Sequence, residues 1–219
     1  MKSSWEETAK RSKYHFNKER MDPRWDTVIG LGRLDPELWR HDIEDIIFQS
    51  RPSTWSTRGY RKEGVAIPPE DLEAEENDLR SIGADPEMII SNIGWQLPDS
   101  LQQIADSFAL SDSMTRLHVQ MPGQVWTRHI DKLDKFNPGS PDQIMRIMVQ
   151  LSDWEPGHFW EFGNYHYRGW RAGDVVTFDW ANVPHSTANA GHLPRVTLQI
   201  TGVRTAATSR YLGLIKNWA

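Results

Sequence analysis

The second half of the chain contains short runs in which apolar and polar residues alternate, a period-two pattern typical of β-strands. In residues 146–151, RIMVQL, three aliphatic side chains share one strand face and Arg146 lies on the other. Residues 195–200, RVTLQI, repeat this pattern with Arg195 on the polar face. The polar faces either meet solvent or, through the two arginines, line a polar cavity between two sheets.

Several such β-rich runs begin near residue 114 and are separated by turn signals such as PG at 122 and NPGSP at 137. Short strands at this spacing predict a β-sandwich or a barrel-like pair of sheets. The predicted strands lie within residues 114–121, 124–130, 146–153, 158–163, 165–170, 174–180 and 195–203.

The first half of the chain is predicted to form helices and loops that cover one sheet. Asp35 is a candidate N-cap, followed by Pro36 at the first helical position. Residues 51–64 are rich in turn formers and charge, which favours an ordinary surface loop over a lid. The predicted helices lie within residues 35–49, 69–83 and 98–110. We expect a single domain, 1–219, divided into a helical and loop part at 1–112, a β core at 113–205 and a C-terminal tail at 206–219.

The composition limits which metal ligands and which kinds of partner the chain can have. The chain has no cysteine, so a metal would have to be held by His, Asp or Glu. A net charge of −5 disfavours general binding to nucleic acid, and no apolar run is long enough to span a membrane. The charged N-terminal residues do not resemble an export signal, so we expect a cytoplasmic protein. Eleven tryptophans favour bulky core packing over substrate stacking.

One group of residues suggests a metal site. His129 and Asp131 are two residues apart at the end of a predicted strand, so their side chains project to the same side. His185 is the natural candidate for a third ligand, and two His with one carboxylate form the facial triad of non-haem Fe(II) oxygenases. Arg195 follows ten residues later and can grip a carboxylate through two hydrogen bonds. The remaining histidines are interpreted as surface or packing residues: His15, His41, His158, His166 and His192.

With these residues in view, positions 114–203 resemble the Fe(II)/2-oxoglutarate-dependent dioxygenase superfamily, and most closely its aspartyl/asparaginyl β-hydroxylase-like branch. The stretches PGQVWTRHID, RIMVQLSD and GDVVTFDWANVPHSTANAGHLPRVTLQI carry the resemblance. It implies a double-stranded β-helix, a jelly-roll and cupin-like fold. It also implies that His129 and His185 ligate iron and that Arg195 anchors the distal carboxylate of 2-oxoglutarate. Arg146 matches a family arginine near the cosubstrate or substrate carboxylate.

The sequence departs from that branch at two places. Typical aspartyl/asparaginyl hydroxylases lack the acidic ligand, whereas Asp131 restores the full triad of the wider superfamily. A small polar cosubstrate contact is expected on the strand before the motif, where this chain has His118 and Gln120 as substitutes. Because both differences lie in the expected site, the resemblance does not imply that this chain hydroxylates Asp or Asn residues in particular.

The resemblance implies an enzyme that uses Fe(II), 2-oxoglutarate and O₂ to hydroxylate an unactivated C–H bond, releasing succinate and CO₂. The substrate would be an amino acid, a small metabolite or a peptide side chain, with Arg58, Arg61 and Arg168 as further arginines that either receive a substrate carboxylate or, as we favour, lie on the surface. The main rival is a cupin-type module that binds a metal or a small molecule without oxygenase activity, and such a module has no need for Arg195. A nucleic-acid demethylase of the same superfamily is disfavoured because RVTLQIT lacks a second arginine.

Overall fold

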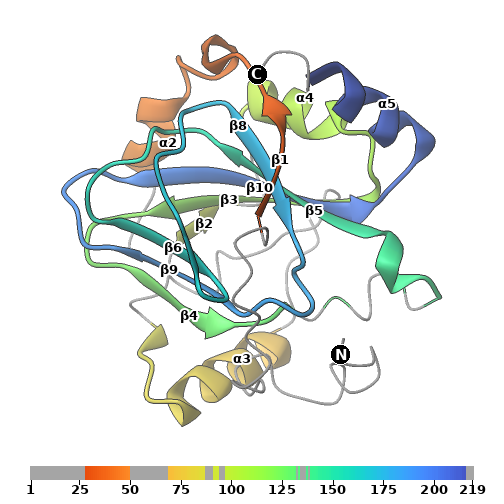
Figure 1. Cartoon of the computed structure of the whole chain (residues 1–219). Coiled ribbons are helices and arrows are strands. Elements are labelled where there is room, and N and C mark those ends of the chain that lie inside the picture. The colour runs from red at the N-terminus through yellow and green to blue at the C-terminus, as the bar shows by residue number, and fades with distance from the viewer. Residues whose placement is uncertain are drawn as a thin grey trace.

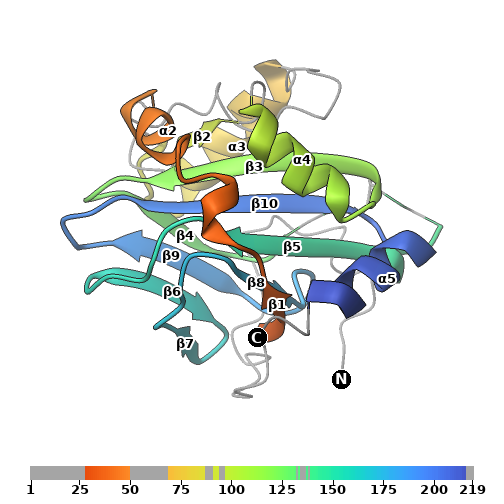
Figure 2. The same ribbon diagram turned by 90° about the horizontal axis from the view of Figure 1, so that it is seen from above.

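The computed structural model consists mainly of two antiparallel β-sheets that face each other, with helices on the outer side of the larger sheet (Figures 1 and 2). The structure describes residues 28–49, 69–86, 91–93, 97–131, 133, 137 and 139–215. None of the helices in these ranges is long and apolar enough to cross a membrane.

The larger sheet has six strands in the order β1-β8-β5-β10-β3-β2. Its strands are β1 (Val28–Arg33), β2 (Ser91–Ile93), β3 (Ser111–Gln120), β5 (Ile144–Gln150), β8 (Asp174–Phe178) and β10 (Arg195–Val203). The strand β10 pairs with β3 on one side and β5 on the other, and both pairings are antiparallel. Three arginines therefore lie on the same inner face of this sheet: Arg116 on β3, Arg146 on β5 and Arg195 on β10.

The smaller sheet has four strands in the order β4-β9-β6-β7. Its strands are β4 (Val125–His129), β6 (His158–Phe162), β7 (Tyr165–Tyr167) and β9 (His185–Asn189). When β3 is counted as the first of eight core strands, the two sheets have the orders 1-8-3-6 and 2-7-4-5, which is a jelly roll. The predicted fold class, a mainly β, cupin-like double-stranded β-helix, is confirmed.

Helices cover the outer face of the larger sheet, as Figure 2 shows for α2, α4 and α5. The helical segments are η2 (Pro36–Leu38), α2 (Ile43–Gln49), α3 (Pro69–Ser81), α4 (Asp99–Ser107), η5 (Pro141–Gln143) and α5 (Ala206–Ile215). Leu101 and Ile104 of α4 pack in one apolar cluster with Leu117, Ile147 and Leu198 of the sheet. Burial of these side chains drives the association of helix and sheet.

The predicted helices are confirmed with altered bounds. The segment 35–49 is divided into η2 and α2, and Asp35 caps the first of them by accepting a hydrogen bond from the backbone N–H of Glu37 at 3.0 Å. The segments 69–83 and 98–110 correspond to α3 and α4. The loop expected at 51–64 lies outside the described residues.

The structure also contains elements that the sequence pattern did not predict. The strands β1 and β2 lie in the part that was expected to hold only helices and loops, and β9 was not predicted at all. The segment expected as a C-terminal tail contains α5. These elements depend on partners far away in the sequence: β1 pairs with β8, and β9 lies between β4 and β6.

The outer face of the larger sheet is apolar, whereas its inner face carries polar side chains beside apolar ones such as Val176 and Phe178. Ile147 and Val149 belong to the cluster under the helices, whereas Arg146 and Gln150 are buried on the opposite side, between the sheets. Of the two interpretations of the polar strand faces, the interior one is correct. A second apolar cluster closes part of the space between the sheets and includes Trp160, Phe162, Trp170, Phe178 and Trp180.

Candidate metal and anion-binding site

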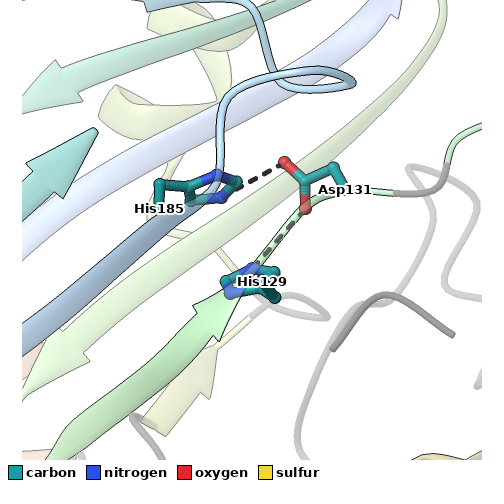
Figure 3. A group of neighbouring side chains, drawn as sticks. All are labelled: His129, Asp131 and His185. Atoms are coloured by element: carbon teal, nitrogen blue, oxygen red, sulfur yellow. Dashed lines mark ion pairs between the residues drawn. The ribbon is translucent and has the colours of Figure 1, made fainter. Parts of the chain in front are cut away.

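Two histidines and an aspartate meet between the sheets (Figure 3). His129 ends β4 and is the register partner of His185, which begins β9. Asp131 follows β4 and turns its carboxylate toward both rings, with Nε2 to oxygen distances of 3.7 Å for His129 and 3.5 Å for His185. One donor atom from each residue lies within 4.8 Å of the others, so the three side chains form a group with the dimensions of a metal site.

The backbone fixes the orientation of both imidazoles. Nδ1 of His129 donates a hydrogen bond to the carbonyl of Thr127 at 2.7 Å, and Nδ1 of His185 donates to the carbonyl of Val183 at 3.1 Å. With the proton on Nδ1, each ring presents the Nε2 lone pair to the shared centre, an arrangement common among metal-ligating histidines. Burial lowers the pKa of His185, and this effect outweighs the raising effect of Asp131. The lowered pKa favours the neutral imidazole that a metal requires.

Arg146 binds the carboxylate of Asp131. Burial alone would raise the pKa of Asp131, but the nearby Arg146 and the two histidines outweigh it and hold the pKa well below its usual range. The Arg146 guanidinium donates from Nη1 to Asp131 Oδ2, and from Nε to the hydroxyl of Thr201 at 3.0 Å. The arginine expected near a cosubstrate or substrate carboxylate is thus engaged with the aspartate of the triad.

A cavity of about 460 Å³, counted with the part that opens to solvent, joins this triad to Arg195. The Arg195 side chain is buried, with 2% of the residue exposed, and its Nε and Nη1 have no hydrogen-bond partner among the described residues. Its guanidinium lies over the ring of Trp160. Burial lowers the pKa of Arg195 to about 9, so the side chain remains charged near neutral pH.

His118 and Gln120, the predicted substitutes for a polar cosubstrate contact, occupy different positions. His118 lines the cavity, where its ring stacks on Trp126 at a centroid distance of 5.9 Å. Gln120 is fully buried beside the cavity, and its amide donates to the carbonyl of Gln124 at 3.0 Å and to the hydroxyl of Thr187 at 3.1 Å. Gln120 therefore connects the two sheets, and its contact with a cosubstrate stays a prediction.

Sequence reasoning missed Arg116 and Gln199, which also line the cavity. Arg116 precedes His118 by two residues, so strand alternation places both on the inner face of β3. This alternation is the signal in the sequence that could have identified Arg116, but it can be used only when the inner face of β3 is known to line the cavity. Of the tryptophans interpreted as packing residues, Trp126 and Trp160 line the cavity as well.

The other candidate residues lie away from the cavity. Arg168, His41 and His192 are exposed, as expected for surface residues. His158 is a buried packing residue, as predicted, whose Nε2 donates to the Leu193 carbonyl at 2.9 Å. His166 is partly buried and stacks on a phenylalanine ring. Arg58, Arg61 and His15 lie outside the described residues.

No protein-family model matches the chain, and no curated protein matches it. Solved structures do match. AviO1 from Streptomyces viridochromogenes Tue57 is 19% identical with a TM-score of 0.46, and the match covers 86% of this chain and 94% of that one. A Cupin 2 conserved barrel domain protein from Salinispora arenicola CNS-205 is 13% identical, with a TM-score of 0.33 and coverage of 57% and 84%. A predicted oxalate decarboxylase from Thermotoga maritima is also 13% identical, with a TM-score of 0.34 and coverage of 52% and 80%. At these scores the similarities do not bear on activity.

Proposed function

We propose that this protein is an Fe(II)- and 2-oxoglutarate-dependent oxygenase that hydroxylates an amino acid, a small metabolite or a peptide side chain. The observation that supports the proposal best is Arg195, a buried guanidinium without an acidic partner among the described residues, in the same cavity as the two histidines and Asp131. Burying an unpaired charge is costly, so its retention favours a role in binding an anion.

The donor set fits ferrous iron. Two imidazoles and one carboxylate suit non-haem Fe(II) better than a structural zinc site, and the chain has no thiolate to offer. A facial arrangement of three protein ligands leaves positions for a chelating cosubstrate and O₂. Bound iron, with 2-oxoglutarate and O₂, would supply the oxidising power for C–H hydroxylation, with succinate and CO₂ as coproducts.

The chain's own residues would bind and orient the reactants. Arg195 would hold the far carboxylate of 2-oxoglutarate through paired hydrogen bonds, with Trp160 supporting the guanidinium plane. Arg146 would keep Asp131 ionised and oriented as a ligand. The aromatic side chains around the cavity would exclude bulk water from the reaction.

A cupin-type binding module is the second candidate. The histidines and the aspartate suit it equally well, because such a module needs a metal or small-molecule site and no more. It differs from an oxygenase in having no use for a charged anchor at Arg195. The two candidates are therefore separated by whether 2-oxoglutarate binds to the metal-loaded protein through this arginine.

An anaerobic titration tests the proposal. We expect Fe(II) followed by 2-oxoglutarate to produce the weak visible charge-transfer band of the chelate, and each single change His129→Ala, Asp131→Ala and His185→Ala to abolish it. Arg195→Ala should raise the 2-oxoglutarate concentration needed for the band, whereas the exposed control Arg168→Ala should not. Bound metal without a band would favour the cupin-type module. If the band appears, assays of succinate release with amino acids, metabolites and peptides follow.

A further inference from the structure

Three guanidiniums line the cavity, and the proposed oxygenase chemistry accounts for two of them. Arg195 would bind the cosubstrate, and Arg146 is bound to Asp131. Arg116 forms no hydrogen bond or ion pair with any described residue, and its Nε is buried. Burial is the main effect on its pKa, which is lowered to about 10, so this third guanidinium is also charged at neutral pH.

The charges inside the cavity do not balance without a further anion. The lining residues supply three guanidiniums and one carboxylate, that of Asp131. A ferrous ion and a 2-oxoglutarate dianion would cancel each other and leave an excess of two positive charges. Charges that line one cavity of a protein interact more strongly than charges in water, so this excess favours a substrate that brings negative charge of its own.

Arg116 and Arg195 act at different ends of the cavity. In the antiparallel register Arg116 is the partner of Gln199, while Arg195 is the partner of Gln120. Gln199 lies four positions after Arg195 on β10, which corresponds to about 13 Å along the strand. Electrostatics agree with this placement: Arg146 and Asp131 both influence the pKa of Arg116, whereas burial is the sole cause of the shift for Arg195. Arg116 therefore lies on the Asp131 side.

We propose that Arg116, with the amide of Gln199 opposite it, forms a second anion-binding subsite that holds a carboxylate of the substrate. That the bound carboxylate belongs to a substrate rests on the proposed function. The subsite itself depends only on the cavity and its charges. A guanidinium forms paired hydrogen bonds with a carboxylate, and a neighbouring amide N–H adds a third donor. Free amino acids and other small carboxylic acids match this subsite better than neutral metabolites do.

Calorimetric titration of the protein loaded with Mn(II) and 2-oxoglutarate tests the subsite. The probes are the twenty common L-amino acids and the straight-chain carboxylic acids of two to six carbons, each paired with its primary carboxamide. We expect at least one acid to bind at least about tenfold more tightly than its carboxamide. Arg116→Gln should weaken that acid by roughly 10- to 100-fold and remove the preference for acid over amide.

Further variants and an unfolding measurement separate subsite loss from other effects. Arg116→Gln should keep the Kd of 2-oxoglutarate within about twofold, whereas Arg195→Gln should raise it by at least about tenfold. Arg116→Lys, which keeps the charge but not the paired geometry, should be intermediate for the acid. Thermal unfolding of each variant confirms that it is folded, and exposed Arg168→Gln serves as the matched control.

The outcomes distinguish this inference from the proposed function. If no acid binds better than its amide, or if Arg116→Gln weakens 2-oxoglutarate as much as Arg195→Gln does, the subsite proposal is overturned. If 2-oxoglutarate fails to bind while an Arg116-dependent preference for acids persists on the protein loaded with Mn(II) alone, the oxygenase proposal fails and the subsite stands.

Discussion

The guanidinium carbon of Arg195 lies 4.7 Å from the ring centroid of Trp160, although the two residues belong to opposite sheets. The contact provides an attractive surface for a buried cation that has no carboxylate partner among the described residues. It also holds the guanidinium at the wall of the cavity, with Nε and Nη1 unpartnered among the described residues. In the proposed function, this contact would preorganise Arg195 for the carboxylate of 2-oxoglutarate.

Changing Trp160 should weaken the proposed binding of 2-oxoglutarate while leaving the Arg195 guanidinium in place. Trp160→Leu removes the aromatic face, so we expect the Kd of 2-oxoglutarate to rise by about 3- to 30-fold, in line with the usual strength of a desolvated cation–π contact. Trp160→Phe keeps a smaller ring and should have a milder effect. The Kd is measured anaerobically by the charge-transfer band. A folded Trp160→Leu variant with wild-type affinity would show that the aromatic contact has no part in binding.

The ion pair between Asp131 and Arg146 predicts a coupled loss of stability. Asp131→Ala leaves the Arg146 guanidinium buried and without its carboxylate, which should lower the free energy of unfolding by about 3 kcal/mol. Arg146→Met in the Asp131→Ala background removes the orphaned charge, so the double variant should be more stable than Asp131→Ala alone. Urea unfolding of metal-free protein measures both effects.

The same variants separate stability from metal binding. Because Asp131 is the proposed ligand, Asp131→Ala and the double variant should both fail to retain iron after dialysis, even where stability has recovered. Arg146→Met alone keeps the three ligand side chains but removes the guanidinium that orients Asp131, so it should retain more iron than Asp131→Ala and less than the wild type. Additive effects of the two substitutions on stability would argue against direct coupling between the residues.

The sequence predicted which candidate metal ligands would lie together, but it missed one of the strands that carry them. His129, Asp131 and His185 carry residue types and spacing that few structural roles require together, and the fold brings them together. The strand that carries His185 was missed because its residues, HSTAN, have no apolar alternation. It forms because β4 and β6 supply hydrogen-bond partners on both sides. Local pattern does not contain that information.

The same dependence on distant parts of the fold explains why sequence reasoning missed Arg116. Alternation placed it on one face with His118, but a polar strand face normally meets solvent. It became a cavity residue because the smaller sheet covers the inner face of the larger one, which is a property of the complete fold. The strand β1 is similar, since its pairing with β8, far away in the sequence, makes it a strand.

A buried histidine away from the triad predicts a loss of stability in mild acid. Burial, aided by the nearby Arg195, lowers the pKa of His158 from 6.5, although the carbonyl of Leu193 and Glu155 oppose the shift. The unfolded chain therefore takes up this proton at a higher pH than the folded protein does. The contribution of His158 to stability is fully present above pH 6.5 and is lost as the pH falls through the lowered pKa.

We expect the free energy of unfolding to fall between about pH 7.5 and pH 5.5. His158→Gln should reduce that fall, because glutamine does not titrate, even if it lowers stability at neutral pH. Urea unfolding of the metal-free protein at both pH values gives the comparison, and the exposed control His192→Gln should follow the wild type. Identical pH dependence in wild type and His158→Gln would assign the effect to other groups.

A close approach of two turns makes Gly157 sensitive to substitution. Its φ of +97° lies in the left-handed region, and a Cβ at this position would come within 2.4 Å of the backbone nitrogen of Gly191. The two turns are also joined by a hydrogen bond from the N–H of Ala190 to the carbonyl of Gly157 at 2.8 Å.

Gly157→Ala should therefore lower the free energy of unfolding by about 2 kcal/mol or more, through backbone strain and loss of this contact. Gly139→Ala, where a Cβ meets no atom within 4 Å, should change it by less than about 0.5 kcal/mol. Equal stability of the two alanine variants would refute the close approach. Because the turn at Gly191 lies between His185 on β9 and Arg195 on β10, Gly157→Ala should also weaken the proposed binding of 2-oxoglutarate.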